Sequence, residues 1–239
     1  MDSRRVIVTD VDGTLTGDDD ALGAFADWLA SCRDRHLLVY ASGRSRSSLV
    51  GMLEATGAPE ADAMISSVGT EIHLGDGRPL PGWGERFNGW DAGRVHRALA
   101  GLPWLERQAA AAQTDLKASY DAGELRPADL EVVRARLTAA AIDATIVYSA
   151  NRHLDVIPDG AGKGIAAREL ARAWAIPPDR VLVFGDSGND AGLYREGFLG
   201  TIVGNALPEL RRAVGSAAYR SPFAYAGGIL DGIRHWSTS

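Results

Sequence analysis

Apolar runs alternate with longer amphipathic stretches over the first third of the chain. Residues 4–9 form a short β-branched run that ends at Asp10, which predicts a buried strand of a parallel sheet. Residues 20–34 carry aromatic and leucine side chains at helical spacing behind a group of aspartates suited to N-capping, which predicts a helix. The same pattern then predicts a strand at 37–40, a helix that begins after 42–45, and strands at 63–66 and 71–74. Alternation of strand and helix is typical of an α/β fold.

The composition changes between Pro79 and Gly84, where proline, glycine and tryptophan accumulate. Beyond this point strands no longer alternate regularly with helices. The pattern predicts a helix near 90–101, a strand near 115–121, a helix at 127–140 that begins with proline, and strands at 144–149 and 153–157 joined by a turn. This middle segment is therefore expected to form a smaller α+β unit.

The first pattern returns after Pro158. It predicts a helix from about residue 163, a strand at 181–184, a helix, a strand at 200–203 and two further helical segments. We therefore predict an α/β core with a mostly parallel sheet, made of residues 1–80 and 158–239, with a smaller α+β domain inserted at residues 81–157.

Charge and composition narrow the functional classes. The 239 residues include 31 acidic and 25 basic side chains, for a net charge of −6, and no dense basic run, which argues against a nucleic-acid partner. No apolar stretch approaches the length of a membrane span, and the N-terminal apolar run is too short for a signal peptide. Cys32 is the only cysteine, so no internal disulfide can form. These features predict a soluble, cytoplasmic protein without a membrane partner.

Polar residues follow the predicted strands where a ligand site is expected. In an open parallel sheet, ligands bind at the carboxyl ends of the strands. The residues placed there are Asp10, Asp12, Ser42, Gly43, Arg44 and the run Gly185-Asp186-Ser187-Gly188-Asn189-Asp190, while Lys163 opens a helix. Carboxylates gathered at one edge repel one another, and a divalent cation would keep them ionised together. Oxygen ligands favour a hard ion, so Mg²⁺ is the predicted cofactor.

Each of these elements has an ordinary structural explanation when it stands alone. Aspartate and glycine are common turn residues, Ser42 is suited to helix capping, and Lys163 between two glycines could be a solvated surface lysine. Their order along the chain, and their common position after predicted strands, favour one shared site.

These motifs resemble a known family. Asp10-Val11-Asp12-Gly13-Thr14, Ser42, Lys163 and Gly185 to Asp190 are similar to the four successive motifs of the haloacid dehalogenase-like (HAD) phosphatase superfamily. The inserted middle segment resembles the α/β cap of the Cof or sucrose-phosphatase type (type C2B). The resemblance implies a Rossmann-like core, a cap that selects the substrate, and phosphomonoester hydrolysis.

The resemblance also implies roles for individual residues, and these agree with their chemistry. Asp10 is expected to attack phosphorus and carry an aspartyl-phosphate, and Asp12 to act as general acid and base. Mg²⁺ is expected between the carboxylates of Asp10 and Asp186 and the backbone carbonyl of Asp12, with Asp190 and Asn189 in support. The groups expected to bind the transferring phosphoryl group are the Ser42 hydroxyl, the Gly43 amide and the Lys163 ammonium.

Further segments resemble a particular subfamily. Residues 67–72, 117–120, 154–158 with 160–164, 203–206 and 226–230 are similar to sucrose-phosphate phosphatases and mannosylfructose-phosphate phosphatases. The substrate implied is a disaccharide phosphate such as sucrose 6-phosphate, with mannosylfructose phosphate or another sugar phosphate as the alternative. The candidate substrate-binding residues are Gly43, Arg44, Thr70, Glu71, Lys117, Ser119, Asn151 and Asn189, with His153 as a further candidate.

One motif departs from the subfamily pattern. Gly13-Thr14-Leu15 stands where plant and cyanobacterial sucrose phosphatases usually have asparagine and then Thr-Trp, so the identity of the sugar stays open. Phosphomannomutases share the opening at residues 10–16, but their fourth motif is longer than the compact Gly185 to Asp190.

Two alternatives belong to other functional classes. A phosphorylated receiver module also collects aspartates, a hydroxyl and a lysine, but it is a single small domain. A non-catalytic sugar-phosphate-binding partner of a synthase would not need every acidic motif residue. A synthase remains a candidate partner of an active enzyme, and the oligomeric state stays open. Of the 25 basic residues only Lys117 and Lys163 are lysine, which suggests positions where arginine cannot substitute.

Overall fold

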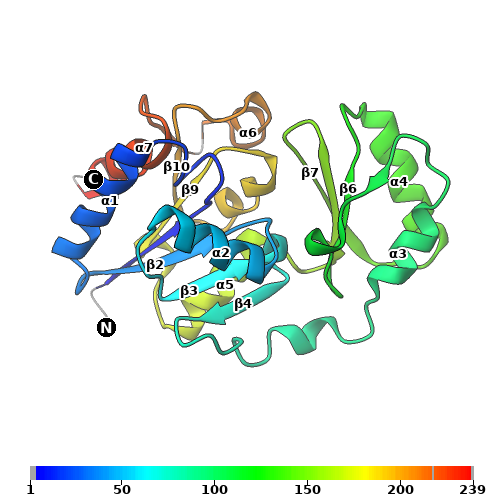
Figure 1. The fold of residues 1–239 in the computed structure, drawn as a ribbon, viewed down its shortest axis with the longest axis horizontal. Coiled ribbons are helices and arrows are strands. Elements are labelled where there is room, and N and C mark those ends of the chain that lie inside the picture. Colours follow the sequence, from blue (N-terminus) through cyan, green and yellow to red (C-terminus); the bar gives the residue numbers. More distant parts are fainter. Residues whose placement is uncertain (1–3, 217, 238–239) are drawn as a thin grey trace.

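Two β-sheets organise the protein (Figure 1). The structure is a computed structural model that describes residues 4–216 and 218–237. The larger sheet has the strand order β11-β10-β9-β1-β2-β3-β4, and all neighbouring strands are parallel except β3 and β4. Its strands are β1 (Arg5–Thr9), β2 (His36–Ala41), β3 (Ala63–Ser66), β4 (Glu71–Leu74), β9 (Val181–Gly185), β10 (Leu199–Ile202) and β11 (Tyr219–Arg220).

Helices cover both faces of the larger sheet because its strands are apolar on both sides. In β1, Val6 and Val8 pack into the hydrophobic cluster on one face, and Ile7 packs into the cluster on the other. The first cluster includes α5 (Lys163–Ala173). The second includes α1 (Asp19–Ser31), α2 (Arg46–Thr56), α6 (Pro208–Val214) and α7 (Tyr225–Ser237).

The smaller sheet is antiparallel, with the strand order β5-β6-β8-β7. Its strands are β5 (Glu106–Arg107), β6 (Ala118–Asp121), β7 (Ala144–Ser149) and β8 (His153–Pro158). Helices α3 (Ala92–Leu99) and α4 (Pro127–Ala139) pack against one face and bury Tyr120 and Leu154. Because side chains alternate along a strand, Ser119 and its partner Asp155 lie on the opposite face. That face is therefore polar.

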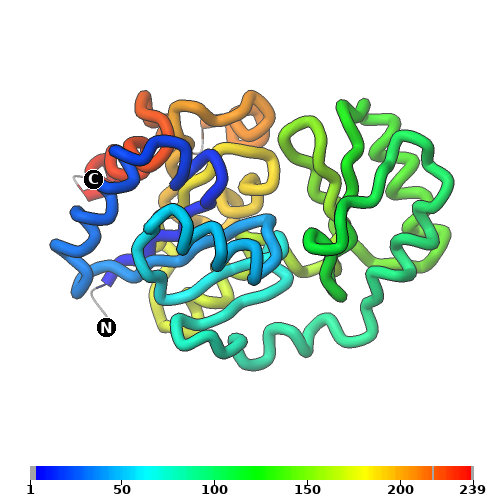
Figure 2. The backbone as a smooth tube through the Cα atoms, viewed as in Figure 1, coloured from blue at the N-terminus to red at the C-terminus, as the bar shows by residue number. Residues whose placement is uncertain are grey.

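The two sheets lie side by side and are joined by two passages of the chain (Figure 2). The first passage leads from β4 through a short 3-10 helix, Gly84–Phe87, to α3, and the second leads from β8 to α5. We call the larger sheet with its helices the larger unit, and the smaller sheet with α3, α4 and their connecting loops the smaller unit. Both ends of the described chain lie on the larger unit, and the Arg5 guanidinium donates to the Ser237 hydroxyl at 3.2 Å. Within the described residues, no helix is both long and apolar enough to cross a bilayer.

The predicted fold class is confirmed: a mostly parallel α/β sheet is combined with a smaller antiparallel one. The differences concern the ends of elements, very short strands and one helix. The helix predicted between the strands at 181–184 and 200–203 is wrong: the chain there forms the short 3-10 turns Gly188–Asp190 and Leu193–Arg195, because glycine, serine, asparagine and aspartate favour turns over a continuous α-helix. The helix predicted at 20–34 ends at Ser31, and the strand predicted at 115–121 begins at Ala118. Strands β5 and β11 have two residues each, too few to leave a period in the sequence. The division into a core and an inserted domain at residues 81–157 stays a prediction.

Candidate active site

Three strand ends place the predicted motif residues at one edge of the larger sheet. Asp10 follows β1, Ser42 follows β2 and Asp186 follows β9. Strands β9, β1 and β2 are adjacent and parallel, so their carboxyl ends meet. The sheet topology therefore gathers residues that are up to 176 positions apart in the sequence.

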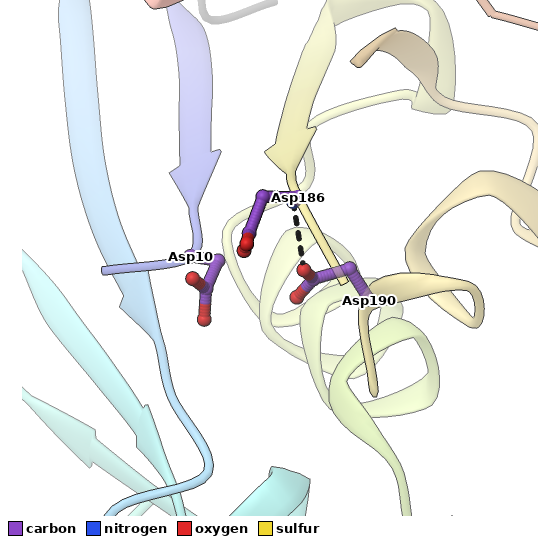
Figure 3. Close-up of side chains that lie close together, drawn as sticks. All are labelled: Asp10, Asp186 and Asp190. Atoms are coloured by element: carbon purple, nitrogen blue, oxygen red, sulfur yellow. Dashed lines mark hydrogen bonds between the residues drawn. The ribbon is translucent and has the colours of Figure 1, made fainter. Parts of the chain in front are cut away.

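A buried cluster of three carboxylates lies at this edge (Figure 3). One oxygen from each of Asp10, Asp186 and Asp190 lies within 4.8 Å of the others. Asp190 Oδ2 accepts hydrogen bonds from the backbone N–H groups of Asp186 (3.0 Å) and Ser187 (3.1 Å), which fixes the loop after β9. The Thr14 hydroxyl donates to Asp186 Oδ1 at 3.2 Å. The backbone thus holds these carboxylates together.

Lys163 lies beneath the cluster with a fully buried side chain. Its Nζ donates to Asp10 Oδ1 (2.7 Å), Asp190 Oδ1 (2.7 Å) and Asn189 Oδ1 (2.8 Å). An ammonium has three hydrogens, and three acceptors surround it. Lys163 therefore fixes the orientation of Asp10 and links the loop after β1 to the loop after β9.

The electrostatics of the cluster favour an additional cation. Burial raises the pKa of Asp10; Lys163 opposes this shift, and the neighbouring carboxylates add to it. Burial, followed by the charge of Asp190, raises the pKa of Asp186 to about 7. Burial by itself would lower the pKa of the Lys163 ammonium. The negative charges of Asp10 and Asp190 outweigh this effect and raise the pKa. One ammonium facing three carboxylates leaves surplus negative charge, and this set of oxygen donors fits a hard divalent cation.

The loop after β2 is held in place by an unusual turn. Backbone N–H groups of Ser67 and Val68 donate to the carbonyls of Arg44 (2.7 Å) and Ser42 (3.1 Å). Both residues of the turn have left-handed backbones, with φ of 51° and 60°. Such a conformation costs a β-branched residue like Val68 about 1–3 kcal/mol, so the surrounding contacts must hold it. The buried Ser42 hydroxyl accepts from the Arg44 N–H at 3.1 Å.

Asp12 lies outside the buried cluster. Its side chain is 49% exposed and forms a two-pronged ion pair with Arg44, whose Nη2 and Nε lie 2.6 Å and 2.8 Å from the carboxylate oxygens. Asp12 and Arg44 both line the cavity described next. The predicted metal contact of Asp12 concerned its backbone carbonyl and stays a prediction.

A cavity of about 570 Å³ lies between the strand ends and the polar face of the smaller sheet. The larger unit contributes Asp10, Asp12, Gly43, Arg44, Ser45, Ser48, Asp186, Ser187, Asn189 and Leu207 to its lining. The smaller unit contributes Gln108, Ala109, Ala111, Ala112, Lys117, Ser149, Ala150, His153 and Asp155. A molecule in the cavity would therefore contact both units.

Lys117 connects the two walls of the cavity. Its buried Nζ donates to the backbone carbonyl of Gly43 at 3.1 Å and lies 3.6 Å from Asp155 Oδ1. Asp155 also accepts a hydrogen bond from the Ser119 hydroxyl. These three polar residues of the smaller sheet form one buried group.

Several predicted substrate residues lie away from this cavity. Thr70 and Glu71 line a separate cavity of about 350 Å³; the Thr70 hydroxyl donates to the Ser67 carbonyl at 3.1 Å, and Glu71 accepts from the Ser66 hydroxyl at 2.8 Å. Asn151 lies in the β7–β8 turn and Ser119 donates to Asp155, and neither is among the residues that line the cavity. Their predicted substrate contacts stay predictions.

Sequence reasoning missed Asp155 and Gln108. Gln108 Nε2 lies 2.9 Å from His153 Nδ1, and both residues line the cavity. Asp155 follows the apolar–polar alternation of a strand, between Leu154 and Val156, which is equally typical of a solvated face, so the sequence did not single it out. Gln108 lies in a loop, where no sequence pattern distinguishes it from other polar residues.

Comparison with known proteins identifies the family. The model of the sucrose-6F-phosphate phosphohydrolase family matches residues 3–237. The chain belongs to this family. It is 35% identical over 246 residues to the mannosylfructose-phosphate phosphatase of Agrobacterium fabrum, covering 99% of this chain and 98% of the relative. It is 33% identical over 252 residues to sucrose-phosphatase 2 of Nicotiana tabacum, covering 98% of this chain but 59% of that longer relative.

Solved structures agree with this assignment. The sucrose-phosphatase of Synechocystis sp., solved with sucrose and phosphate, superposes with a TM-score of 0.93 at 30% identity and covers 99% of both chains. A HAD subclass IIB sugar phosphatase superposes with a TM-score of 0.70 at 16% identity, which shows the shared fold. The protein is thus a sucrose-phosphatase-like member of the HAD superfamily and a phosphoric monoester hydrolase. The predicted superfamily is confirmed, and the receiver-module alternative is wrong.

Proposed function

We propose that the protein is a Mg²⁺-dependent phosphatase that hydrolyses a disaccharide phosphate, such as sucrose 6-phosphate, through an aspartyl-phosphate. The observation that carries the proposal is the position of Asp10. Its carboxylate is oriented by Lys163 at 2.7 Å, lies beside Asp186, and faces a cavity whose far wall is polar. A carboxylate held in this way is suited to nucleophilic attack on phosphorus.

In the first step, the Asp10 carboxylate attacks phosphorus, the Asp10 oxygen–phosphorus bond forms, and the bond to the sugar oxygen breaks. Asp12 gives a proton to the departing sugar oxygen. In the second step, Asp12 takes a proton from a water that attacks the aspartyl-phosphate, which releases phosphate and regenerates Asp10. The contact with Arg44 places the Asp12 carboxyl group at the edge of the cavity; Asp12 donates in its protonated form, which requires its release from this ion pair. An incoming phosphoryl group offers Arg44 a second anionic partner, which would loosen its hold on Asp12.

The phosphoryl group is held by the groups around Asp10. The Ser42 hydroxyl and the Gly43 N–H lie on the loop that the Ser67–Val68 turn fixes. Lys163 orients Asp10 and offsets the charge of the carboxylates, and a contact with the phosphoryl group would replace one of its three present hydrogen bonds. Asp10, Asp186 and Asp190 are the residues that would hold Mg²⁺. When bound, the cation neutralises the carboxylates and polarises the phosphoryl oxygens.

The smaller sheet provides the sugar-binding wall in this proposal. Its cavity-facing polar groups include Lys117, Asp155, His153 and Gln108, which can donate to and accept from sugar hydroxyls. The cavity volume of about 570 Å³ falls within the range common for small-molecule sites, about 300–1,000 Å³. We assign residues 81–157 as the specificity cap, place the protein in the cytoplasm, and regard a sugar-phosphate synthase as a candidate partner.

A substrate panel tests the proposal. Phosphate release is measured with and without Mg²⁺ for sucrose 6-phosphate, mannosylfructose phosphate, trehalose 6-phosphate and simple hexose phosphates. We expect one disaccharide phosphate to exceed the hexose phosphates by about tenfold or more in kcat/KM, since a few sugar hydroxyl contacts contribute this much. A flat profile would refute disaccharide specificity. Release that does not depend on Mg²⁺ would refute the cofactor.

A further inference from the structure

A glutamate, Glu209, joins the two units beside residues that line the cavity. Glu209 lies in the first turn of α6, and its Oε1 accepts the backbone N–H of Ala150 at 2.8 Å and of Gly188 at 2.8 Å. Ala150 lies in the β7–β8 turn of the smaller sheet, and Gly188 lies in the loop after β9. Figure 1 shows this hairpin beside α6. The carboxylate oxygen therefore ties together two peptides from different units.

The peptide groups of Ala150 and Gly188 both lie next to residues of the site. Gly188 opens the short 3-10 turn Gly188–Asp190, which carries Asn189 and Asp190, the two residues of this loop that accept from Lys163. Ala150 and its neighbour Ser149 line the cavity from the smaller unit. A shift of either peptide would move a wall of the cavity.

The packing at Gly188 gives independent support. A Cβ on Gly188 would lie 2.7 Å from the Tyr148 carbonyl oxygen and 2.9 Å from Glu209 Oε1. The backbone of Gly188 does not have a positive φ, so turn geometry does not require glycine here. The close approach of the hairpin does require it. The loop is thus shaped to receive both the hairpin and the carboxylate.

The start of α6 is also anchored to the site. The Leu207 N–H, which directly precedes the helix, donates to the Asp186 carbonyl at 2.7 Å, and Leu207 lines the cavity. Glu209 therefore projects from a base that is fixed relative to the carboxylate cluster.

We propose that Glu209 is a positioning residue that sets the spacing between the two walls of the cavity. Its effect is largest for a substrate that contacts both walls and small for one that reaches only Asp10 and its neighbours. The kinetic part of this inference rests on the proposed phosphatase function. The structural part, the pair of hydrogen bonds from Ala150 and Gly188 to Glu209, is independent of that function.

The test compares Glu209→Ala with Glu209→Gln. In Glu209→Ala we expect the amides of Ala150 and Gly188 to exchange hydrogen about tenfold faster or more, because both lose their acceptor. We expect kcat/KM for sucrose 6-phosphate to fall about 10- to 100-fold, mainly through KM, and that for p-nitrophenyl phosphate to change less than about threefold. Glu209→Gln keeps an accepting oxygen and is expected to stay within about threefold of the parent on both substrates.

Controls separate this role from a general effect on stability. Asp20→Ala removes an exposed first-turn acid from α1 and should change neither exchange at Ala150 nor the ratio between substrates. Gly188→Ala tests the hairpin contact by structure alone: because its Cβ pushes the hairpin away, hydrogen exchange at Ala150 should rise as it does in Glu209→Ala. If Glu209→Ala does not fold, Glu209→Asp, which withdraws the carboxylate by one methylene, carries the comparison with Glu209→Gln.

Two results would overturn the inference. One is unchanged exchange at Ala150 in the variant that lacks the carboxylate. The other is an equal loss on the large and the small substrate, which would make Glu209 a support of the loop after β9 alone. If the parent protein released no phosphate from any ester, the proposed function would fail, while the exchange measurement would still decide whether the tie exists.

Discussion

The two lysines of the chain belong to different units and have different surroundings: Lys117 lines the cavity, whereas Lys163 is buried next to Asp10. Lys163, on the larger unit, has a fully buried ammonium with three side-chain acceptors at 2.7–2.8 Å. Lys117, on the smaller unit, donates to one backbone carbonyl at 3.1 Å and lies 3.6 Å from one carboxylate. The larger unit thus holds its charged groups in a saturated network before any substrate arrives. On the smaller unit, Lys117 can therefore still donate a hydrogen bond to a ligand.

The largest expected effect comes from removing the nucleophile on the larger unit. Asp10→Asn keeps the shape of the side chain and an oxygen that can accept from Lys163, so the protein should remain folded with an unchanged or higher Tm. Turnover should fall by roughly 10⁴-fold or more, because an amide cannot form the aspartyl-phosphate. Phosphate release and thermal unfolding measure the two effects. Substantial remaining activity would show that another group attacks phosphorus.

Removal of divalent cations should come next in size, and it should be reversible. Chelation leaves Asp10, Asp186 and Asp190 with one ammonium as counter-charge, so activity should be lost and then restored by Mg²⁺. Because the cation binds the folded state, Mg²⁺ at 100 times its Kd should stabilise the protein by about 2.7 kcal/mol, seen as a rise in Tm. Asp186→Asn is the matched variant, in which the rise should shrink. An equal rise in both proteins would place the cation elsewhere.

Lys163→Arg should impair turnover although the charge is unchanged. The enclosed site has three acceptors arranged around a compact ammonium, and a guanidinium is larger and planar. Overpacking should cost about 1–3 kcal/mol in unfolding free energy, and kcat should fall about 100-fold as Asp10 loses its orientation. Denaturant unfolding and steady-state kinetics measure these effects. A normal kcat in this variant would show that the three hydrogen bonds of Lys163 are not needed to orient Asp10.

Lys117→Arg should have the smallest effect and a different kinetic signature. We expect KM for the sugar phosphate to rise about tenfold with kcat changed less than about threefold, because the contact with Gly43 and the polar wall are altered while Asp10 is not. If Lys163→Arg and Lys117→Arg changed KM and kcat in the same proportion, the distinction between the two units would be wrong.

The difference between the units also explains what the sequence could predict. Asp10, Ser42 and Asp186 each follow a strand directly, so their convergence is predicted by local pattern and by the rule for parallel sheets. On the smaller sheet the relevant neighbours are set by pairing. Asp155 faces Ser119 only because β6 and β8 adopt one particular register, which no local pattern specifies.

Two further residues show the same limit. Glu71 was expected near the substrate from the resemblance of residues 67–72 to sucrose-phosphate phosphatases. It lies in β4, antiparallel to β3, and lines a separate cavity, so its substrate contact stays a prediction that the local sequence cannot decide. Glu209 contacts two peptides that are 38 positions apart from each other, Ala150 and Gly188. Helical periodicity predicts which face of α6 is exposed and carries no information about distant backbone groups.

The contact between Arg5 and Ser237, near the two ends of the described chain, has a practical consequence for handling the protein. Arg5 and Ser237 are joined at the end of β1 remote from Asp10, because strand β1 runs from that edge toward the site. Arg5 and Ser237 therefore lie away from the cavity mouth. A peptide linking Arg5 to Ser237 would span little distance, so a circularly permuted chain opened at another loop could report separation of the two walls through fluorophores on its new ends.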